Sequence, residues 1–207
     1  MNLSDALEQA ASGESILFLG AGFSLGATNV KGQAFEAGGG LAKLLAARCG
    51  LPEKSPLEDA AEIFASKFGT DDLIKELRRE FTTKEVSGSH ETIAALPWKR
   101  IYTTNYDNVF ETAAAKSNRI VVPIGPDANL HDTPKNEALC IHLNGYINAL
   151  DRKTLWDSFK LTDTSYATAS IEKSEWAALF RQDIRYARSV FLIGYSLFDL
   201  DIKRILH

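Results

Sequence analysis

Cysteine is scarce in this chain. Only two of its 207 residues are cysteines, and they lie far apart in the sequence. Cys49 and Cys140 form no C-x-x-C pair, so the sequence supports neither a disulfide framework nor a zinc site made of cysteines. We therefore predict two buried free thiols and no bound metal.

Long apolar runs and an excess of positive charge are missing as well. No run approaches the roughly 18 apolar residues that a membrane-spanning helix needs, and the first residues carry no basic cluster of the kind that opens a signal peptide. With a formal net charge of −4, the chain has no basic footprint for nucleic acid. We predict a cytoplasmic protein that binds neither a membrane nor nucleic acid.

What the sequence does contain is an alternation of strands and helices. Hydrophobic residues make up 45% of the chain, enough for one main domain. Short apolar or β-rich runs predict strands at 16–19, 101–104, 120–122, 138–143 and 190–193. Apolar residues at helical spacing predict helices at 3–11, 41–49, 57–68, 70–81, 89–96, 109–115 and 175–186. This order predicts an α/β fold with a Rossmann-like parallel sheet flanked by helices.

The region between the first two predicted strands is different. Residues 25–40 hold five glycines and few periodic apolar positions, so we predict a loop there, either a lid over a ligand or a plain connector. The helices that follow predict a small helical subdomain, inserted at about 39–96 into one domain that spans residues 1–207. The sequence stops inside a helix predicted from Asp199 or Leu200, and we expect it to be the N-terminal part of a longer protein.

The first strand opens into a glycine-rich turn, Gly20-Ala-Gly22-Phe-Ser24. Glycines permit a sharp turn and a close approach of the backbone to a ligand, and the N–H groups of such a turn can cradle an anion such as a pyrophosphate. Leu25 stands where the dinucleotide fingerprint G-x-G-x-x-G has its third glycine, so that fingerprint is not matched. An ordinary strand-to-helix turn explains the glycines about equally well.

Polar residues follow four of the predicted strands. They occupy residues 20–24, 104–107, 142–145 and 194–196. In an open parallel sheet, ligands bind in the crevice outside the carboxyl ends of the strands. The sequence therefore predicts one site that all four strand ends share.

Three of these stretches resemble motifs of the SIR2-like family, the NAD-consuming relatives of sirtuins that occur in bacterial antiphage defence proteins. Gly20-Ala-Gly-Phe-Ser24 resembles the family's G-A-G-x-S, and Thr103-Thr-Asn-Tyr-Asp107 resembles its T-x-N-x-D. Gly194-Tyr-Ser-Leu-Phe-Asp199 resembles a late G-x-S-x-x-D element that contacts the adenosine half of NAD+. The resemblance spans residues 15–205 and implies that the dinucleotide is bound by Gly20, Ala21, Gly22, Phe23, Ser24, Thr104, Gly194, Ser196 and Asp199.

The resemblance also implies a reaction, cleavage of the bond between nicotinamide and ribose. That reaction passes through an oxocarbenium-like state, so the pocket must orient ribose and water more than it must donate a proton. Asn105 would hold a ribose hydroxyl or the attacking water, and Asp107 would orient the sugar or the nicotinamide side. Both residues also fit a purely structural role, as caps of the helix predicted from Val109.

The position of the catalytic base departs from the family pattern. The family has L-H-G at the end of a strand, and here the matching residues are Leu143-Asn144-Gly145. His142 lies two residues earlier, on the same face of the strand as Asn144, so either residue is a candidate to handle the proton. A core histidine that bonds to a backbone carbonyl is the alternative role for His142.

Two functions are consistent with these residues. The first is an NAD+ hydrolase, a metal-independent glycohydrolase that releases nicotinamide and ADP-ribose as the effector of a bacterial antiviral abortive-infection system. With two cysteines the chain cannot form the four-cysteine zinc module of sirtuin deacylases, so water is the expected acceptor. The second is a weak or inactive sensor or assembly module that binds NAD+ or ADP-ribose.

Family members are commonly oligomeric and regulated, so we expect a homo-oligomer and a regulatory partner or C-terminal domain.

Overall fold

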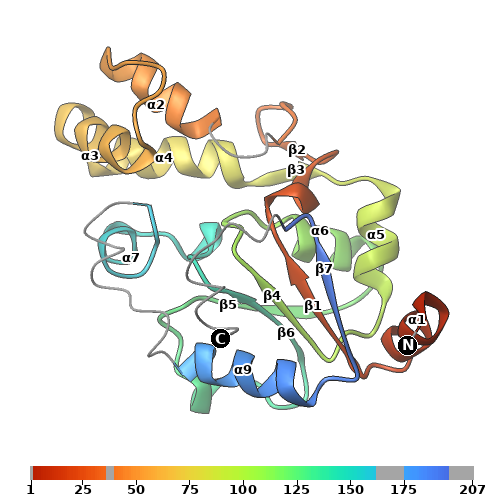
Figure 1. Ribbon diagram of the computed structural model, residues 1–207. Coiled ribbons are helices and arrows are strands. Elements are labelled where there is room, and N and C mark those ends of the chain that lie inside the picture. The colour runs from red at the N-terminus through yellow and green to blue at the C-terminus, as the bar shows by residue number, and fades with distance from the viewer. Residues whose placement is uncertain (1, 36–39, 162–174, 196–207) are drawn as a thin grey trace.

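A five-stranded parallel sheet forms the centre of the molecule, with strand order β5-β6-β4-β1-β7 (Figure 1). The structure is a computed structural model and describes residues 2–35, 40–161 and 175–195. Each pair of neighbouring strands in this sheet is parallel, so the carboxyl ends of its strands lie at one edge. The strands are β1 (Ser15–Leu19), β4 (Arg100–Thr103), β5 (Val121–Ile124), β6 (Ala138–His142) and β7 (Ser189–Ile193).

Helices cover both faces of the sheet, as the uninterrupted apolar sequence of β1 predicts. Leu17 and Leu19 pack against one face, with α1 (Leu3–Ala11), α5 (Gly88–Ala95) and α6 (Val109–Lys116). Ile16 and Phe18 pack against the other face, with α9 (Glu175–Tyr186). The full burial of an apolar side chain of this kind stabilises the folded state by about 1.5–3 kcal/mol. The predicted α/β fold with a Rossmann-like sheet is therefore confirmed.

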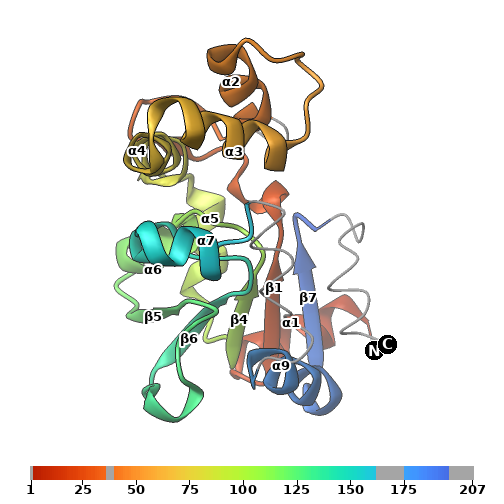
Figure 2. The ribbon, with the colours of Figure 1, turned by 90° about the vertical axis from the view of Figure 1, so that its left-hand side faces the viewer.

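Three further helices lie beyond the carboxyl ends of the strands (Figure 2). They are α2 (Gly40–Cys49), α3 (Leu57–Phe68) and α4 (Thr70–Phe81). Their core is shared with the segment after β6, which contains η3 (Ile147–Ala149) and α7 (Arg152–Asp157). The division of the chain into a sheet domain and a helical insertion at about 39–96 stays a proposal.

The region predicted as a loop at 25–40 contains a strand. β2 (Thr28–Asn29) pairs antiparallel with β3 (Thr83–Glu85), a strand that the sequence did not predict, and Thr28 also bridges to Ala34. Both strands are too short and too polar to show an alternating apolar pattern, so only their pairing across the chain reveals them. The prediction of a plain loop was wrong for this part of the segment, and residues 36–39 lie outside the described residues.

Two smaller predictions also need correction. The third strand was predicted to stop before Pro123, but β5 runs through it. β5 is an edge strand, and there a proline can be tolerated although it lacks an N–H group. The helix predicted at 89–96 instead spans Gly88–Ala95, where Ser87 is the N-cap and forms a capping box with His90. The helix predicted from Asp199 or Leu200 lies outside the described residues.

None of the helices in the described ranges has the length and apolar character that crossing a bilayer requires.

The carboxyl ends of β1 and β7 touch through glycine backbones. The N–H of Gly20 donates to the carbonyl of Ile193, and the N–H of Gly22 donates to that of Gly194 at 2.8 Å. A Cβ on Gly20 would lie 2.6 Å from the Gly194 oxygen, and a Cβ on Gly194 would lie 2.0 Å from the amide nitrogen of Phe23. These glycines therefore permit one chain segment to approach another. The amides of Gly20, Gly22 and Phe23 all donate within the protein, so the anion cradle expected here is not formed by them.

Replacing Gly194 by alanine should destabilise the protein far more than the backbone conformation alone requires. Gly194 and Gly50 have similar positive φ values, 68° and 72°, but a Cβ on Gly50 meets nothing within 4 Å. We expect Gly50→Ala to cost about 1–2 kcal/mol, the penalty of the left-handed conformation, and Gly194→Ala to cost at least about 2 kcal/mol more through the clash. Urea unfolding of both variants measures this, and equal losses would contradict the packing role.

Candidate active site

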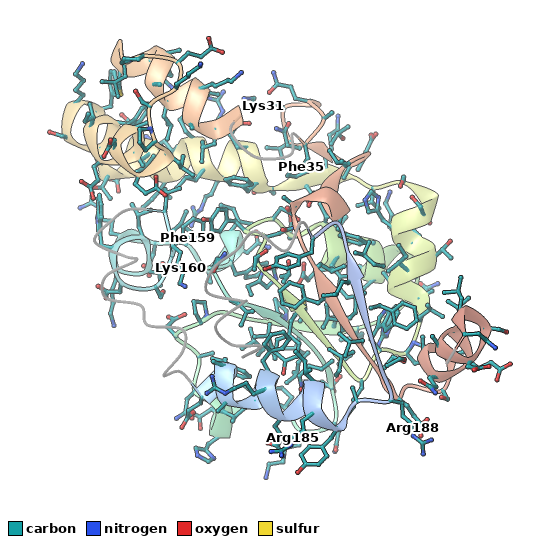
Figure 3. The ribbon with its side chains drawn as sticks, in the orientation of Figure 1. Lys31, Phe35, Phe159, Lys160, Arg185 and Arg188 are labelled. Atoms are coloured by element: carbon teal, nitrogen blue, oxygen red, sulfur yellow. The ribbon has the colours of Figure 1, made fainter. Side chains whose placement is uncertain are left out.

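A pocket of about 790 Å³ opens at the carboxyl edge of the sheet. One wall comes from η1 (Ala21–Ser24) and from the turn between β4 and α6. The facing wall comes from α2, α4 and the segment around β2, where Lys31 and Phe35 project (Figure 3). The volume lies within the range of about 300–1,000 Å³ that is usual for small-molecule and cofactor sites.

Three polar side chains on the first wall form a hydrogen-bonded chain. Asn105 donates from Nδ2 to the carbonyl of Gly20 and to Oγ of Ser24, both at 3.0 Å. Ser24 donates from Oγ to Oδ2 of Asp107 at 2.7 Å. All three residues are at most 9% exposed, so these bonds form away from bulk water. These hydrogen bonds fix the rotamer of each of the three side chains, because each donor has a defined acceptor.

The backbone of Asn105 is held as firmly as its side chain. Its N–H donates to Oγ1 of Thr103, and its carbonyl accepts from Nδ1 of His142 at 2.9 Å. The side-chain oxygen Oδ1 accepts no hydrogen bond from any residue that the structure describes. Asn105 therefore brings a positioned acceptor to the pocket wall, with its donors already used.

Asp107 also anchors the start of α6. Its Oδ1 accepts from the N–H of Val109, the first residue of α6, at 3.1 Å, whereas the N-cap position that was predicted for Asp107 is occupied by Asn108. Burial raises the pKa of Asp107, although the hydrogen bonds from Ser24 and Val109 act in the opposite direction. A carboxyl group whose pKa is raised in this way is suited to accept a proton during a reaction.

His142 lies behind this wall, outside the lining of the pocket. It is 1% exposed, and its Nε2 lies 2.9 Å from Oε1 of Glu111 on α6. With Nδ1 on the carbonyl of Asn105, both ring nitrogens face oxygen acceptors, which is the arrangement of a doubly protonated ring. The geometry matches the core-histidine alternative, in which the ring bonds to a backbone carbonyl.

Asn144 is also absent from the pocket lining. Its Nδ2 donates to the carbonyl of Thr104 at 3.3 Å, and its own carbonyl accepts from the N–H of Lys160. The side chain supports the backbone next to Asn105.

One group of side chains could hold a metal ion. Atoms of Glu111, Cys140 and His142 that could act as ligands lie within 4.8 Å of one another. Glu111 and His142 already bond to each other, and Sγ of Cys140 lies 3.8 Å from Nε2 of His142. The prediction that no metal binds is not tested by this geometry and stays a prediction.

The predicted site residues fall into three sets. The pocket is lined by Ala21, Ser24, Thr104, Asn105 and Asp107. The lining does not include Gly20, Gly22, Phe23, His142, Asn144 and Gly194. Ser196 and Asp199 lie outside the described residues.

Sequence reasoning missed Glu111 and the far wall of the pocket. Glu111 is the single acidic residue in the short, mostly apolar helix α6, a signal that could have indicated an inward-facing carboxylate. The far wall includes Lys31 and Glu80, which form an ion pair, and the rings of Phe35 and Phe81. It depends on the pairing of β2 with β3, and no motif marks it.

The fold and the pocket define a class, an α/β protein with a Rossmann-like sheet and a pocket at its carboxyl edge. The chain belongs to the SIR2-like domain family, whose family model matches residues 99–207. SIR2-like domains use NAD+ as substrate, so membership links this chain to NAD chemistry. The match includes Asn105 and Asp107, while the turn at 20–24 precedes it and is joined to it through Gly194. A comparison with curated proteins returned no match.

Replacing Asp107 by asparagine should change how stability depends on pH. The folded pKa of Asp107 is raised above its ordinary value of 3.8, so the folded state binds more protons than the unfolded state between those two values. The stability of the wild type should therefore fall relative to Asp107→Asn as pH rises above 3.8 through the raised pKa, by up to about 1.4 kcal/mol per pH unit. Denaturant unfolding of both proteins across this pH range measures the difference. A difference that stays constant with pH would contradict the raised pKa.

Proposed function

We propose that this domain is an NAD+ glycohydrolase that releases nicotinamide and ADP-ribose without a metal. The observation that carries the proposal is the state of Asn105. It lines the pocket, its donors are bonded to the protein, and its Oδ1 accepts no bond from the described residues. Such an oxygen is placed to accept a hydrogen bond from a ribose hydroxyl or from the attacking water.

The chemistry needs only a few groups. The bond between the anomeric carbon and the nicotinamide nitrogen breaks, and its electron pair neutralises the positive charge of the ring. Water then bonds to the anomeric carbon and loses a proton. Asp107 lines the pocket, and its raised pKa suits it to receive that proton or to stabilise the oxocarbenium-like state.

The apolar part of the pocket supports the same chemistry. Phe35, Leu41 and Phe81 lie on the wall opposite Asn105. Apolar walls exclude bulk water, which strengthens the electrostatic effect of the few polar groups that remain. We propose that this wall covers the reacting end of the dinucleotide.

The biological setting follows from the family resemblance. We propose that the domain acts as the effector of a bacterial antiviral abortive-infection system and depletes NAD+ in the cytoplasm when triggered. A homo-oligomer and a regulatory partner or C-terminal domain belong to the same proposal. The dinucleotide site would be completed by Ser196 and Asp199.

Asn105→Ala should abolish most of the activity. We expect the rate of nicotinamide release from NAD+ to fall on the order of 100-fold, because the acceptor that orients ribose or water is lost. Chromatographic analysis of NAD+, nicotinamide and ADP-ribose measures it. Asn148→Ala is the matched control, since Asn148 is exposed and lies outside the pocket lining. The proposal fails if an assembled wild-type protein releases no nicotinamide, or if both variants behave alike.

A sensor that binds NAD+ or ADP-ribose without cleaving it is the second candidate. The observation that favours it is that no histidine of the described residues lines the pocket, with Asn144 in the expected position and His142 bonded on both nitrogens. In that case calorimetry should detect binding while the ligand is recovered intact. Asn144→His should then start turnover, and activity of the wild type would exclude the sensor.

A further inference from the structure

We propose that Glu111 is a positioning residue of the candidate active site, which acts through His142 to hold Asn105 in its working orientation. The inference rests on the proposed function, because it explains how the group assigned to ribose or water is kept in place. It gives His142 a positioning role too, instead of a role in proton transfer.

The first step is the bond between Glu111 and His142. Oε1 of Glu111 lies 2.9 Å from Nε2, and the two side chains are 12% and 1% exposed. An acceptor at Nε2 favours the ring orientation in which Nδ1–H points at the carbonyl of Asn105. The carboxylate thus fixes the rotation of the imidazole and its donor at Nδ1.

The second step is the bond between His142 and the main chain of Asn105. The carbonyl of Asn105 receives Nδ1–H at 2.9 Å, and the amide of the same residue is held by Thr103. Together these bonds fix the peptide groups on both sides of the Cα of Asn105. The direction of its side chain is then set before any ligand arrives, which is the preorganisation that orienting groups need.

The charge states of Glu111 and His142 depend on each other and on the groups around them. The other titratable groups near the ring are Asp107, Cys140 and Tyr146. Burial alone would lower the pKa of His142, but the charge of Glu111 and its hydrogen bond raise it above the ordinary value. Burial likewise acts to raise the pKa of Glu111, but the charge of His142 and the hydrogen bonds from His142 and Cys140 together lower that pKa below its ordinary value. Each group therefore stabilises the charged form of the other.

The test compares two substitutions of Glu111 with a control on the same helix. Glu111→Ala removes the acceptor, whereas Glu111→Gln keeps a group of similar size that can bond to Nε2 in either tautomer of the ring. Lys116→Ala is the control, because Lys116 lies at the end of α6 and its contact with Glu91 is a surface ion pair of 3.9 Å. The measurements are kcat and KM for NAD+ hydrolysis, the melting temperature, and hydrogen exchange over residues 103–107.

We expect Glu111→Ala to lower kcat on the order of 100-fold with a change in KM below about 5-fold, since misplacing an orienting group acts mainly on the reacting geometry. Exchange over residues 103–107 should become faster. Glu111→Gln should recover kcat to within about 10-fold of the wild type, and Lys116→Ala should match the wild type in kcat, KM and exchange. A purely structural role would lower the melting temperature without this split between kcat and KM.

Three results would overturn the inference. One is a Glu111→Ala protein with wild-type kcat and wild-type exchange over residues 103–107. Another is a Glu111→Gln protein that is as impaired as Glu111→Ala. The third is a stoichiometric metal ion in purified wild type that Cys140→Ser loses while Cys49→Ser retains it, since Glu111 and His142 would then be ligands. If the wild type hydrolyses no NAD+, the proposed function fails, while exchange and the calorimetric affinity for ADP-ribose still decide whether Glu111 positions Asn105.

Discussion

The hydrogen bonds of Asn105 join the ends of three neighbouring strands. Its side chain bonds to the turn after β1, its backbone continues β4, and its carbonyl accepts from His142 at the end of β6. Each such bond contributes only about 0.5–1.5 kcal/mol net, but a buried partner left unsatisfied costs about 1–3 kcal/mol. Losing one of these bonds therefore costs more than that bond contributes, so the bonds are retained together and hold the shape of the pocket wall.

The same wall depends on a backbone contact that admits no side chains. The direct contact between Gly22 and Gly194 holds η1 against the end of β7, and Ser24 in the same η1 bonds to Asp107. The glycines thus contribute to the site through the position of Ser24, whereas the expected contribution was through their own N–H groups. Of the predicted ligand-binding residues in this turn, Ala21 and Ser24 line the pocket.

The sequence predicted those parts of the molecule that have a local signal. The apolar run of β1 and the helical spacing of α3 and α4 gave these elements nearly to the residue. It also gave the meeting of Ser24, Asn105 and Asp107, because parallel strands place their carboxyl ends together. The sequence could not predict β2, the bond between Glu111 and His142, or the far wall of the pocket, because each of these depends on residues that are distant in the chain.

Pro123 has a consequence for how copies of this protein could associate. It lies within β5, the outermost strand on one side of the sheet, and it has no N–H to offer. An unprotected edge strand recruits strands of other molecules and leads to aggregation, and a proline interrupts the required ladder of donors. Pro123 therefore disfavours an association of copies in which a strand of one molecule extends the sheet of another past β5.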